Sequence, residues 1–100
     1  MPTVFITVPP TAATDVVETL LEERLAACVN RIETRSSYRW DGEVVHDEEE
    51  ILLVKTSDDA YDDLVARVEE IHPYEVPCIE RFEESHVLES FATWRAEALE

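Results

Sequence analysis

The chain has 100 residues, 45% of them hydrophobic, and its 24 acidic against 8 basic side chains give a formal net charge of −16. This length suits a single domain over residues 1–100, with enough apolar material to bury a core. The acidity excludes a nucleic-acid-binding surface, because contact with phosphates needs a basic stripe.

The charge also bears on the surroundings of the protein. Lys55 is the only lysine, and the other basic residues are arginines. In molar salt the screening length falls to about 3 Å, which removes most of the self-repulsion of such a chain. We interpret the acidity as adaptation to a salt-rich, halophilic cytosol; the alternative is an acidic surface matched to one basic partner. No apolar run approaches about 18 residues and no basic leader is present, so we expect a cytoplasmic protein without membrane contact.

Two segments are predicted before the middle of the chain. Val4, Ile6 and Val8 alternate with Phe5 and Thr7, which predicts a buried strand over residues 3–8 that ends at a pair of prolines. Apolar residues at helical spacing then predict a helix from about Ala13 to Leu25, with Thr11 or Thr14 as its N-cap.

A long β-hairpin follows. Cys28 to Trp40 lacks helical periodicity and is predicted as a strand, and Asp41-Gly42 is the favoured pair for a type I′ turn into a strand from Glu43 to Thr56. At about 3.3 Å per residue the first strand spans roughly 43 Å, whereas a domain of this length is roughly 33 Å across. The hairpin must therefore bend at bulges or project, and its apolar side chains predict pairing with another copy of the chain.

The second half predicts two helices around a short strand. Ser57 or Asp58 can cap a helix that Pro73 ends, and Cys78 to Phe82 is predicted as the fourth strand. The last helix is predicted from Val87 to Leu99. We expect the side chains of Leu88, Phe91 and Trp94 to point toward the interior of the protein.

This order, βαββαβ followed by a helix, indicates an α+β, ferredoxin-like fold: an antiparallel sheet with helices on one face. In that topology the second and fourth strands are opposite edges of the sheet. Cys28 and Cys78 should therefore lie too far apart for a disulfide or a shared metal within one subunit. Across a subunit interface the two cysteines could meet.

Several motifs recur in the order found in one family. They are Leu25-Ala26-Ala27-Cys28-Val29-Asn30, Tyr38-x-Trp40-x-Gly42, Glu49 followed by Leu52-Leu53-Val54-Lys55-Thr56, His72-Pro73-Tyr74-Glu75-Val76-Pro77, and Trp94. From Val4 to about Ala96 the chain resembles the CutA divalent-cation-tolerance proteins. The resemblance implies a tight homotrimer, similar in architecture to the trimeric nitrogen-regulatory signalling proteins, with a role in tolerance of divalent metals and with copper binding.

The chain departs from the family pattern in places. Cys78 stands where an acidic residue is frequent, and Glu50 stands where an apolar strand residue is usual. A cysteine that some members carry in the first strand is absent, which puts any copper site built on that residue in doubt.

Two residues are candidate metal ligands. Cys28 could supply a thiolate, the donor that copper(I) prefers, or could be a small buried apolar residue. His72 could contact a metal or ligand, or could simply be a cation at a helix C-terminus, where the helix dipole stabilises it. No pair of histidines has the spacing of a dedicated metal site.

Five residues are predicted to line a ligand cleft between subunits. Lys55 ends an apolar strand and needs a carboxylate partner, either Glu49 or Glu75, which a neighbouring subunit could supply. Trp40 and Tyr74 could stack on a ligand or pack at an interface. The predicted cleft comprises Tyr38, Trp40, Glu49, Lys55 and Tyr74.

The motifs leave two functional hypotheses. The first is a homotrimeric metal-response protein that binds copper or another divalent ion at clefts between subunits. The second is a trimeric signalling adaptor, in which a small anion binds near Lys55 and the trimer docks on an unidentified protein. No catalytic triad, phosphate loop or HExxH motif is present, so we expect no enzymatic activity and no organic cofactor.

Overall fold

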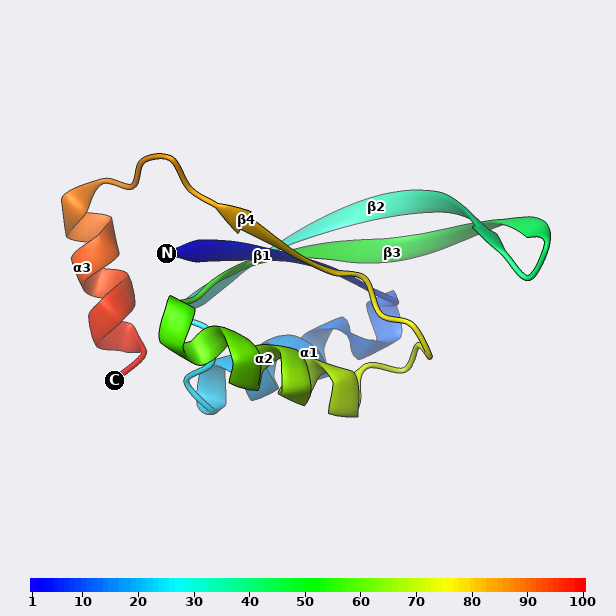
Figure 1. Ribbon diagram of the computed structural model, residues 1–100. Coiled ribbons are helices and arrows are strands. Elements are labelled where there is room, and N and C mark those ends of the chain that lie inside the picture. Colours follow the sequence, from blue (N-terminus) through cyan, green and yellow to red (C-terminus); the bar gives the residue numbers. More distant parts are fainter.

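The computed structural model describes residues 1–100, which form one four-stranded sheet and three helices (Figure 1). The elements in chain order are β1 (Pro2–Val8), α1 (Pro10–Glu22), β2 (Cys28–Trp40), β3 (Glu43–Lys55), α2 (Asp58–Ile71), β4 (Ile79–Glu83) and α3 (Glu89–Ala98). None of these helices is long and apolar enough to cross a membrane.

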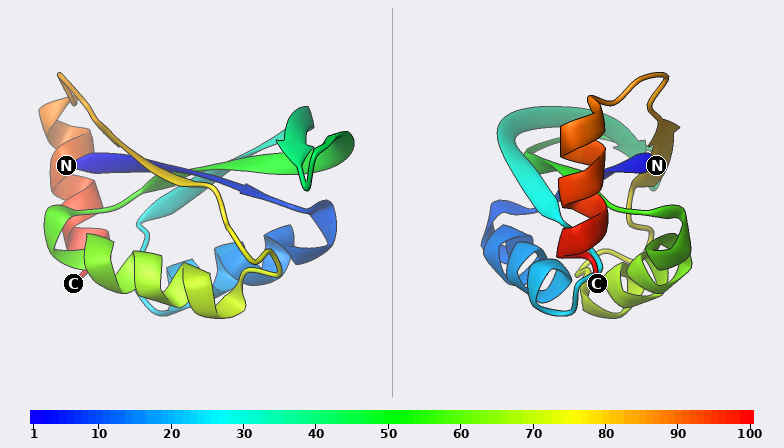
Figure 2. Two further views of the ribbon diagram at one scale, coloured as in Figure 1. Left: turned by 45° about the vertical axis from the view of Figure 1, so that its right-hand side comes forward. Right: turned by 90° about the vertical axis from the view of Figure 1, so that its left-hand side faces the viewer.

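The sheet is antiparallel throughout, in the order β2-β3-β1-β4. Helices α1 and α2 lie side by side on one face, and α3 stands across the end of the sheet near the N-terminus (Figures 1 and 2). The predicted ferredoxin-like fold with an additional C-terminal helix is therefore confirmed. The sheet face opposite α1 and α2 carries no helix, and we call it the open face.

The core lies between the sheet and the two helices. Strands β1 and β3 contribute alternate residues, and helices α1 and α2 contribute residues three or four positions apart, as the periodicity of each element requires. Full burial of a Val, Leu or Ile side chain contributes roughly 1.5–3 kcal/mol, so this cluster holds the helices against the sheet. Its members are Val4, Ile6, Val8, Ala13, Val16, Leu20, Ala26, Leu52, Val54, Leu64 and Val68.

The ends of the two core helices have different causes. Helix α1 begins earlier than predicted, because Pro10 occupies its first turn, where a missing N–H and a fixed φ are favourable. It ends at Glu22, before Leu25, and Arg24 just beyond it takes a left-handed φ of 58°. Helix α2 is capped as predicted: Ser57 Oγ accepts a 3.1 Å hydrogen bond from the Ala60 N–H.

The hairpin projects, as its length predicts. The β2–β3 register runs from Cys28–Lys55 to Trp40–Glu43 without a bulge, and φ angles of 53° at Asp41 and 80° at Gly42 fit a type I′ turn. Strand β1 pairs only with residues 50–55 of β3, so the rest of the hairpin extends beyond the sheet (Figure 1). The longest dimension of the molecule is 45 Å.

The interior side of α3 differs from the prediction. Leu88 is 66% exposed and Trp94 is 46% exposed, whereas Arg95 is only 1% exposed. Phe91 is half-buried and lies 5.4 Å below the Arg95 guanidinium. The prediction was wrong because it counted hydrophobic residues alone. An arginine can be buried where carbonyl oxygens accept its hydrogen bonds and a carboxylate compensates its charge.

Candidate functional site

A cavity of about 530 Å³ lies where the hairpin leaves the sheet, beside the segment that follows α2. We call this cavity the cleft. Its walls are formed by strands β1, β2 and β3 and by the segment that follows α2. Its lining residues are Thr7, Ser36, Tyr38, Trp40, Glu49, Pro73, Tyr74, Glu75, Val76 and Cys78.

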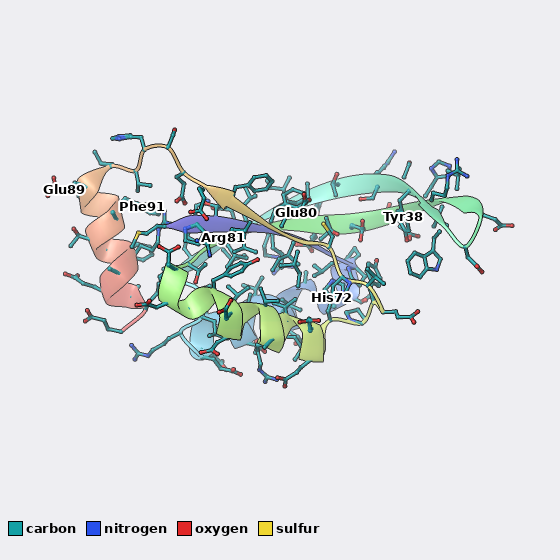
Figure 3. All side chains as sticks on the ribbon, in the orientation of Figure 1. Tyr38, His72, Glu80, Arg81, Glu89 and Phe91 are labelled. Carbon is teal, nitrogen blue, oxygen red and sulfur yellow. The ribbon has the colours of Figure 1, made fainter.

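Strand alternation places the hairpin residues of the cleft. Ser36, Tyr38 and Trp40 occupy alternate positions of β2, so their side chains point to the same side of the hairpin. Glu49 in β3 is opposite Thr34 of β2, on that same side. Figure 3 shows Tyr38 on the hairpin at the level where the sheet ends.

His72 fixes the other wall of the cleft. Its Nε2 lies 2.8 Å from the Thr7 carbonyl oxygen, and its Nδ1 accepts a 3.1 Å hydrogen bond from the Tyr74 N–H. These two contacts define the neutral tautomer that carries its proton on Nε2. Pro73 and Pro77 stiffen the segment that follows. The histidine thus ties the segment after α2 to β1, near the hairpin (Figure 3).

Two tyrosine–carboxylate hydrogen bonds involve tyrosines of the cleft, one across the cleft and one within the hairpin. Tyr74 donates its hydroxyl to Glu49 Oε2 at 3.1 Å, and Tyr38 donates its hydroxyl to Asp47. Burial, followed by the charge of Glu49, raises the pKa of Tyr74 to about 12. The hydrogen bond to Asp47 raises the pKa of Tyr38 as well. Both phenols therefore stay protonated at neutral pH and hold the loop and the hairpin to their carboxylates.

The charges that line the cleft are all negative. No lysine, arginine or histidine is among its lining residues, whereas Glu49 and Glu75 are. Glu49 is only 5% exposed, and it takes part in none of the chain's ion pairs. A buried carboxylate without a compensating cation is costly. The single chain thus leaves a negative charge uncompensated in the cleft wall.

Cys78 is one of the cleft residues that the sequence analysis did not place in the predicted cleft. It directly precedes β4, and its thiol donates to Glu80 Oε1 at 3.6 Å. Burial, and then the contact with Glu80, raises the pKa of Cys78, so the thiol is held in its protonated form. The signal that could have found it is its position directly after Pro77, at the end of the His72–Pro77 motif.

Lys55 does not line the cleft within one chain. It is paired with Thr3 and Cys28 at the far end of β3, six positions from Glu49, which corresponds to roughly 20 Å of strand. The structure therefore brings four of the five predicted cleft residues together and leaves Lys55 apart. Neither Glu49 nor Glu75 forms an ion pair with it in the chain.

Cys28 and His72 do not meet within one chain either. Cys28 is level with Thr3 at one end of the sheet, and His72 bonds to Thr7, so at least four strand positions, roughly 13 Å, separate them. No group of three or more His, Cys, Asp or Glu residues is arranged to hold a metal ion. Both nitrogens of His72 are already engaged. Within one chain the two predicted ligands therefore lie apart, and a metal site that combines donors from several subunits stays a prediction.

The fold and the cleft define a class of protein: a ferredoxin-like domain with an open sheet face and a ligand-sized cavity beneath a projecting hairpin. Comparisons with known proteins give the family. The model of the CutA1 divalent ion tolerance protein family matches residues 2–98, so the chain belongs to that family.

Three relatives show how close the likeness is. The Divalent-cation tolerance protein CutA of Thermus thermophilus is 53% identical over 76 residues, 74% of each chain. The crystal structure of CutA1 from Pyrococcus horikoshii has a TM-score of 0.94 and 39% identity, with 98% of this chain and 97% of that one covered. The PII-like protein CutA from Nostoc sp. PCC 7120, in its apo form, has a TM-score of 0.95 and 29% identity, covering 100% and 98%.

Proposed function

We propose that this protein is a homotrimeric metal-response protein, in which each ligand site is the cleft beside Tyr38, Trp40, Glu49 and Tyr74 together with residues of a neighbouring subunit. The proposed role is binding and response, without a catalytic step. The family's description, divalent ion tolerance, supports the metal-related role.

The open face of the sheet is the observation that supports assembly. Apolar side chains occupy it, and two of them, Phe5 and Phe82, stack edge to face with centroids 6.2 Å apart. Phe82 remains 51% exposed and Ile32 remains 44% exposed. Ile51 and Leu53 extend the same surface along β3. An apolar sheet face needs a covering layer, and other copies of the chain can supply it.

Copper or another divalent ion would bind between subunits under this proposal. Cys28 opens one edge strand, and Cys78 immediately precedes the strand at the opposite edge. Both thiols are free and partly accessible. Contact between opposite edges of two subunits would place two sulfur donors together, which is the ligand type that copper(I) prefers. Glu49 and Glu75 line the same cleft as Cys78.

A signalling adaptor is the second candidate, and the cleft geometry favours it specifically. The cavity lies between a stiff, proline-flanked segment and a projecting hairpin, and Tyr74 joins the two through Glu49. A small ligand in this position would change how the hairpin is presented to a partner protein. The likeness to a PII-like protein is consistent with this role.

Copper binding, followed through Trp40, separates the two candidates. The chain has two tryptophans, so Trp94→Phe leaves Trp40 as the only reporter, and it lines the cleft. We expect copper(I), titrated anaerobically in molar salt, to quench this fluorescence to saturation at a fixed ratio per subunit or per trimer. Cys28→Ser/Cys78→Ser should abolish the effect, whereas His86→Ala, an exposed loop control, should not.

Unsaturable uptake that the cysteine substitutions leave unchanged would contradict the metal proposal. It would mean that the acidic surface collects ions without a site. The adaptor role would then account for the cleft.

A further inference from the structure

We infer that Lys55 of one subunit pairs with Glu49 of the next, so that the cleft is complete only in the assembled protein. The inference rests on the proposed homotrimer. It assigns the partner charge that each of these two residues lacks within a single chain.

Glu49 presents the first unmatched charge. Glu49 is only 5% exposed and lines the cleft. The single hydrogen bond of its side chain is the 3.1 Å contact from the Tyr74 hydroxyl. A neutral phenol satisfies one oxygen but does not compensate the charge. A cation must therefore come from outside the chain.

Lys55 presents the second. It is the only lysine, it is half-buried, and all six ion pairs in the chain are made by arginines. Its cross-strand neighbours, Thr3 and Cys28, carry no opposite charge. The ammonium group thus lacks a carboxylate, in a chain with 24 acidic residues.

Both charges lie on the open face. Leu52 and Val54 point into the core, so strand alternation puts Glu49, Ile51, Leu53 and Lys55 on the other side of β3. An apolar strip with an acid at one end and a base at the other is complementary to a second copy that meets it end to end. Such a head-to-tail contact is heterologous, which is the type of contact that a cyclic trimer is built from.

The pairing has a consequence for the ligand. With Lys55 from the neighbouring subunit, the cleft gains its only positive charge, next to the aromatic walls formed by Tyr38, Trp40 and Tyr74. A site with one ammonium and one carboxylate suits a ligand that carries an anionic group together with a hydrogen-bond donor. The wall of the isolated chain, which is negative throughout, would repel an anion.

A double-mutant cycle on the trimer tests the pair. The variants are Glu49→Gln, Lys55→Met and the double substitution, with Glu48→Gln as the control, since Glu48 is an exposed neighbour on the opposite side of β3. The readout is the dissociation constant of the trimer, measured by light scattering on dilution in molar salt, with circular dichroism to establish folding. We expect each single substitution to raise that constant roughly tenfold or more, and the double to raise it no further than the larger single effect.

Additive effects of the two substitutions in a protein that still forms trimers would overturn the pair and leave the proposed trimer intact. A monomeric wild-type chain would instead overturn the proposed trimer. The charge-exchange variant Glu49→Lys/Lys55→Glu provides a second, independent test of the pairing. It should form trimers better than either charge reversal alone, and failure to do so would contradict the pairing.

Discussion

Arg95 and Glu84 form an ion pair of 3.0 Å, with Arg95 1% exposed and the Glu84 side chain 19% exposed. The same Arg95 Nη1 lies 3.4 Å from the Pro2 carbonyl oxygen and 3.5 Å from that of Thr56. Thr3 donates a 2.6 Å hydrogen bond to the same Glu84 oxygen. This network attaches α3 to the end of the sheet where the chain starts.

Arg95→Met should destabilise the protein strongly. The substitution keeps most of the side-chain volume but removes the cation paired with Glu84 and a hydrogen-bond donor to the carbonyl oxygens of Pro2 and Thr56. Breaking a buried ion pair from one side costs about 3 kcal/mol or more. Urea unfolding at neutral pH measures this loss. A change below about 0.5 kcal/mol, the range of an ordinary surface substitution, would contradict the account of α3.

The loss of unfolding free energy at acidic pH should depend on Glu84. Burial raises the pKa of Glu84, but hydrogen bonds from Thr3 and Arg95 and the Arg95 charge outweigh it and lower the pKa below its ordinary value of 4.5. A lowered pKa contributes stability above the unfolded-state value, and this contribution is lost as pH falls through the folded-state value. Between pH 7 and about pH 3, the wild type should therefore lose more free energy of unfolding than Glu84→Gln. Parallel curves for the two proteins would exclude the coupling.

The hydroxyl of Tyr74 should lose its proton at a higher pH than that of an ordinary tyrosine. Its pKa is raised to about 12 by burial and by Glu49, so the folded protein holds the phenolic proton through a range where the unfolded chain has lost it. The corresponding stability is present below pH 10 and is lost as pH rises toward 12. Ultraviolet absorbance titration of wild type and Tyr74→Phe checks this. The variant should lack the phenolate step near pH 12; a step unchanged by the substitution would refute the assignment.

His72 should matter for folding through its two hydrogen bonds, and not as a metal ligand. His72→Ala removes a donor to the Thr7 carbonyl and an acceptor for the Tyr74 N–H, at a cost of about 2 kcal/mol in the free energy of unfolding. His72→Asn places an oxygen acceptor near the Nδ1 position and should cost about half as much. Copper affinity of the Asn variant should equal that of the wild type. A large loss of copper affinity in that variant would restore His72 as a ligand.

The hairpin turn should depend on backbone conformation alone. A Cβ at Gly42 would meet no atom within 4 Å, but the φ of 80° strains a residue with a side chain. Gly42→Ala should lower the free energy of unfolding by about 1 kcal/mol, whereas Gly42→Asn should cost less, because asparagine tolerates the left-handed region. Equal stability of both variants with the wild type would show that the turn is not type I′ in solution.

The hairpin shows what local sequence can predict. Alternation from Cys28 to Trp40 and the Asp41-Gly42 pair are local signals, and they placed the strands almost to the residue. The bounds of α1 were harder, because Pro10 served as a helix start where Thr11 or Thr14 were expected to cap. The identity of the buried residue in α3 was not predictable from hydrophobicity, since it depends on oxygen atoms from Glu84 and from Pro2 and Thr56, the last two distant in the sequence.

Only part of the cleft was predicted, because only some of its residues belong to local sequence motifs. Tyr38, Trp40 and Tyr74 stand out as aromatic residues in turn-flanked motifs, and the structure does place them around one cavity. Cys78 gave only a weak signal, because a lone cysteine is more often packing material than a site. Lys55 lies at the end of β3, away from the cleft of its own chain. In the proposed trimer its partner belongs to another copy of the chain, and a motif within one chain does not contain that information.

The mass of the protein in solution tests the central claim most directly, because the completed cleft requires several copies of the chain. Light scattering in molar salt, which screens the net charge of −16, should give three times the chain mass of 11.5 kDa. That mass should persist on dilution. A value equal to one chain would contradict the proposed trimer, the cleft between subunits and the pairing of Lys55 with Glu49 together.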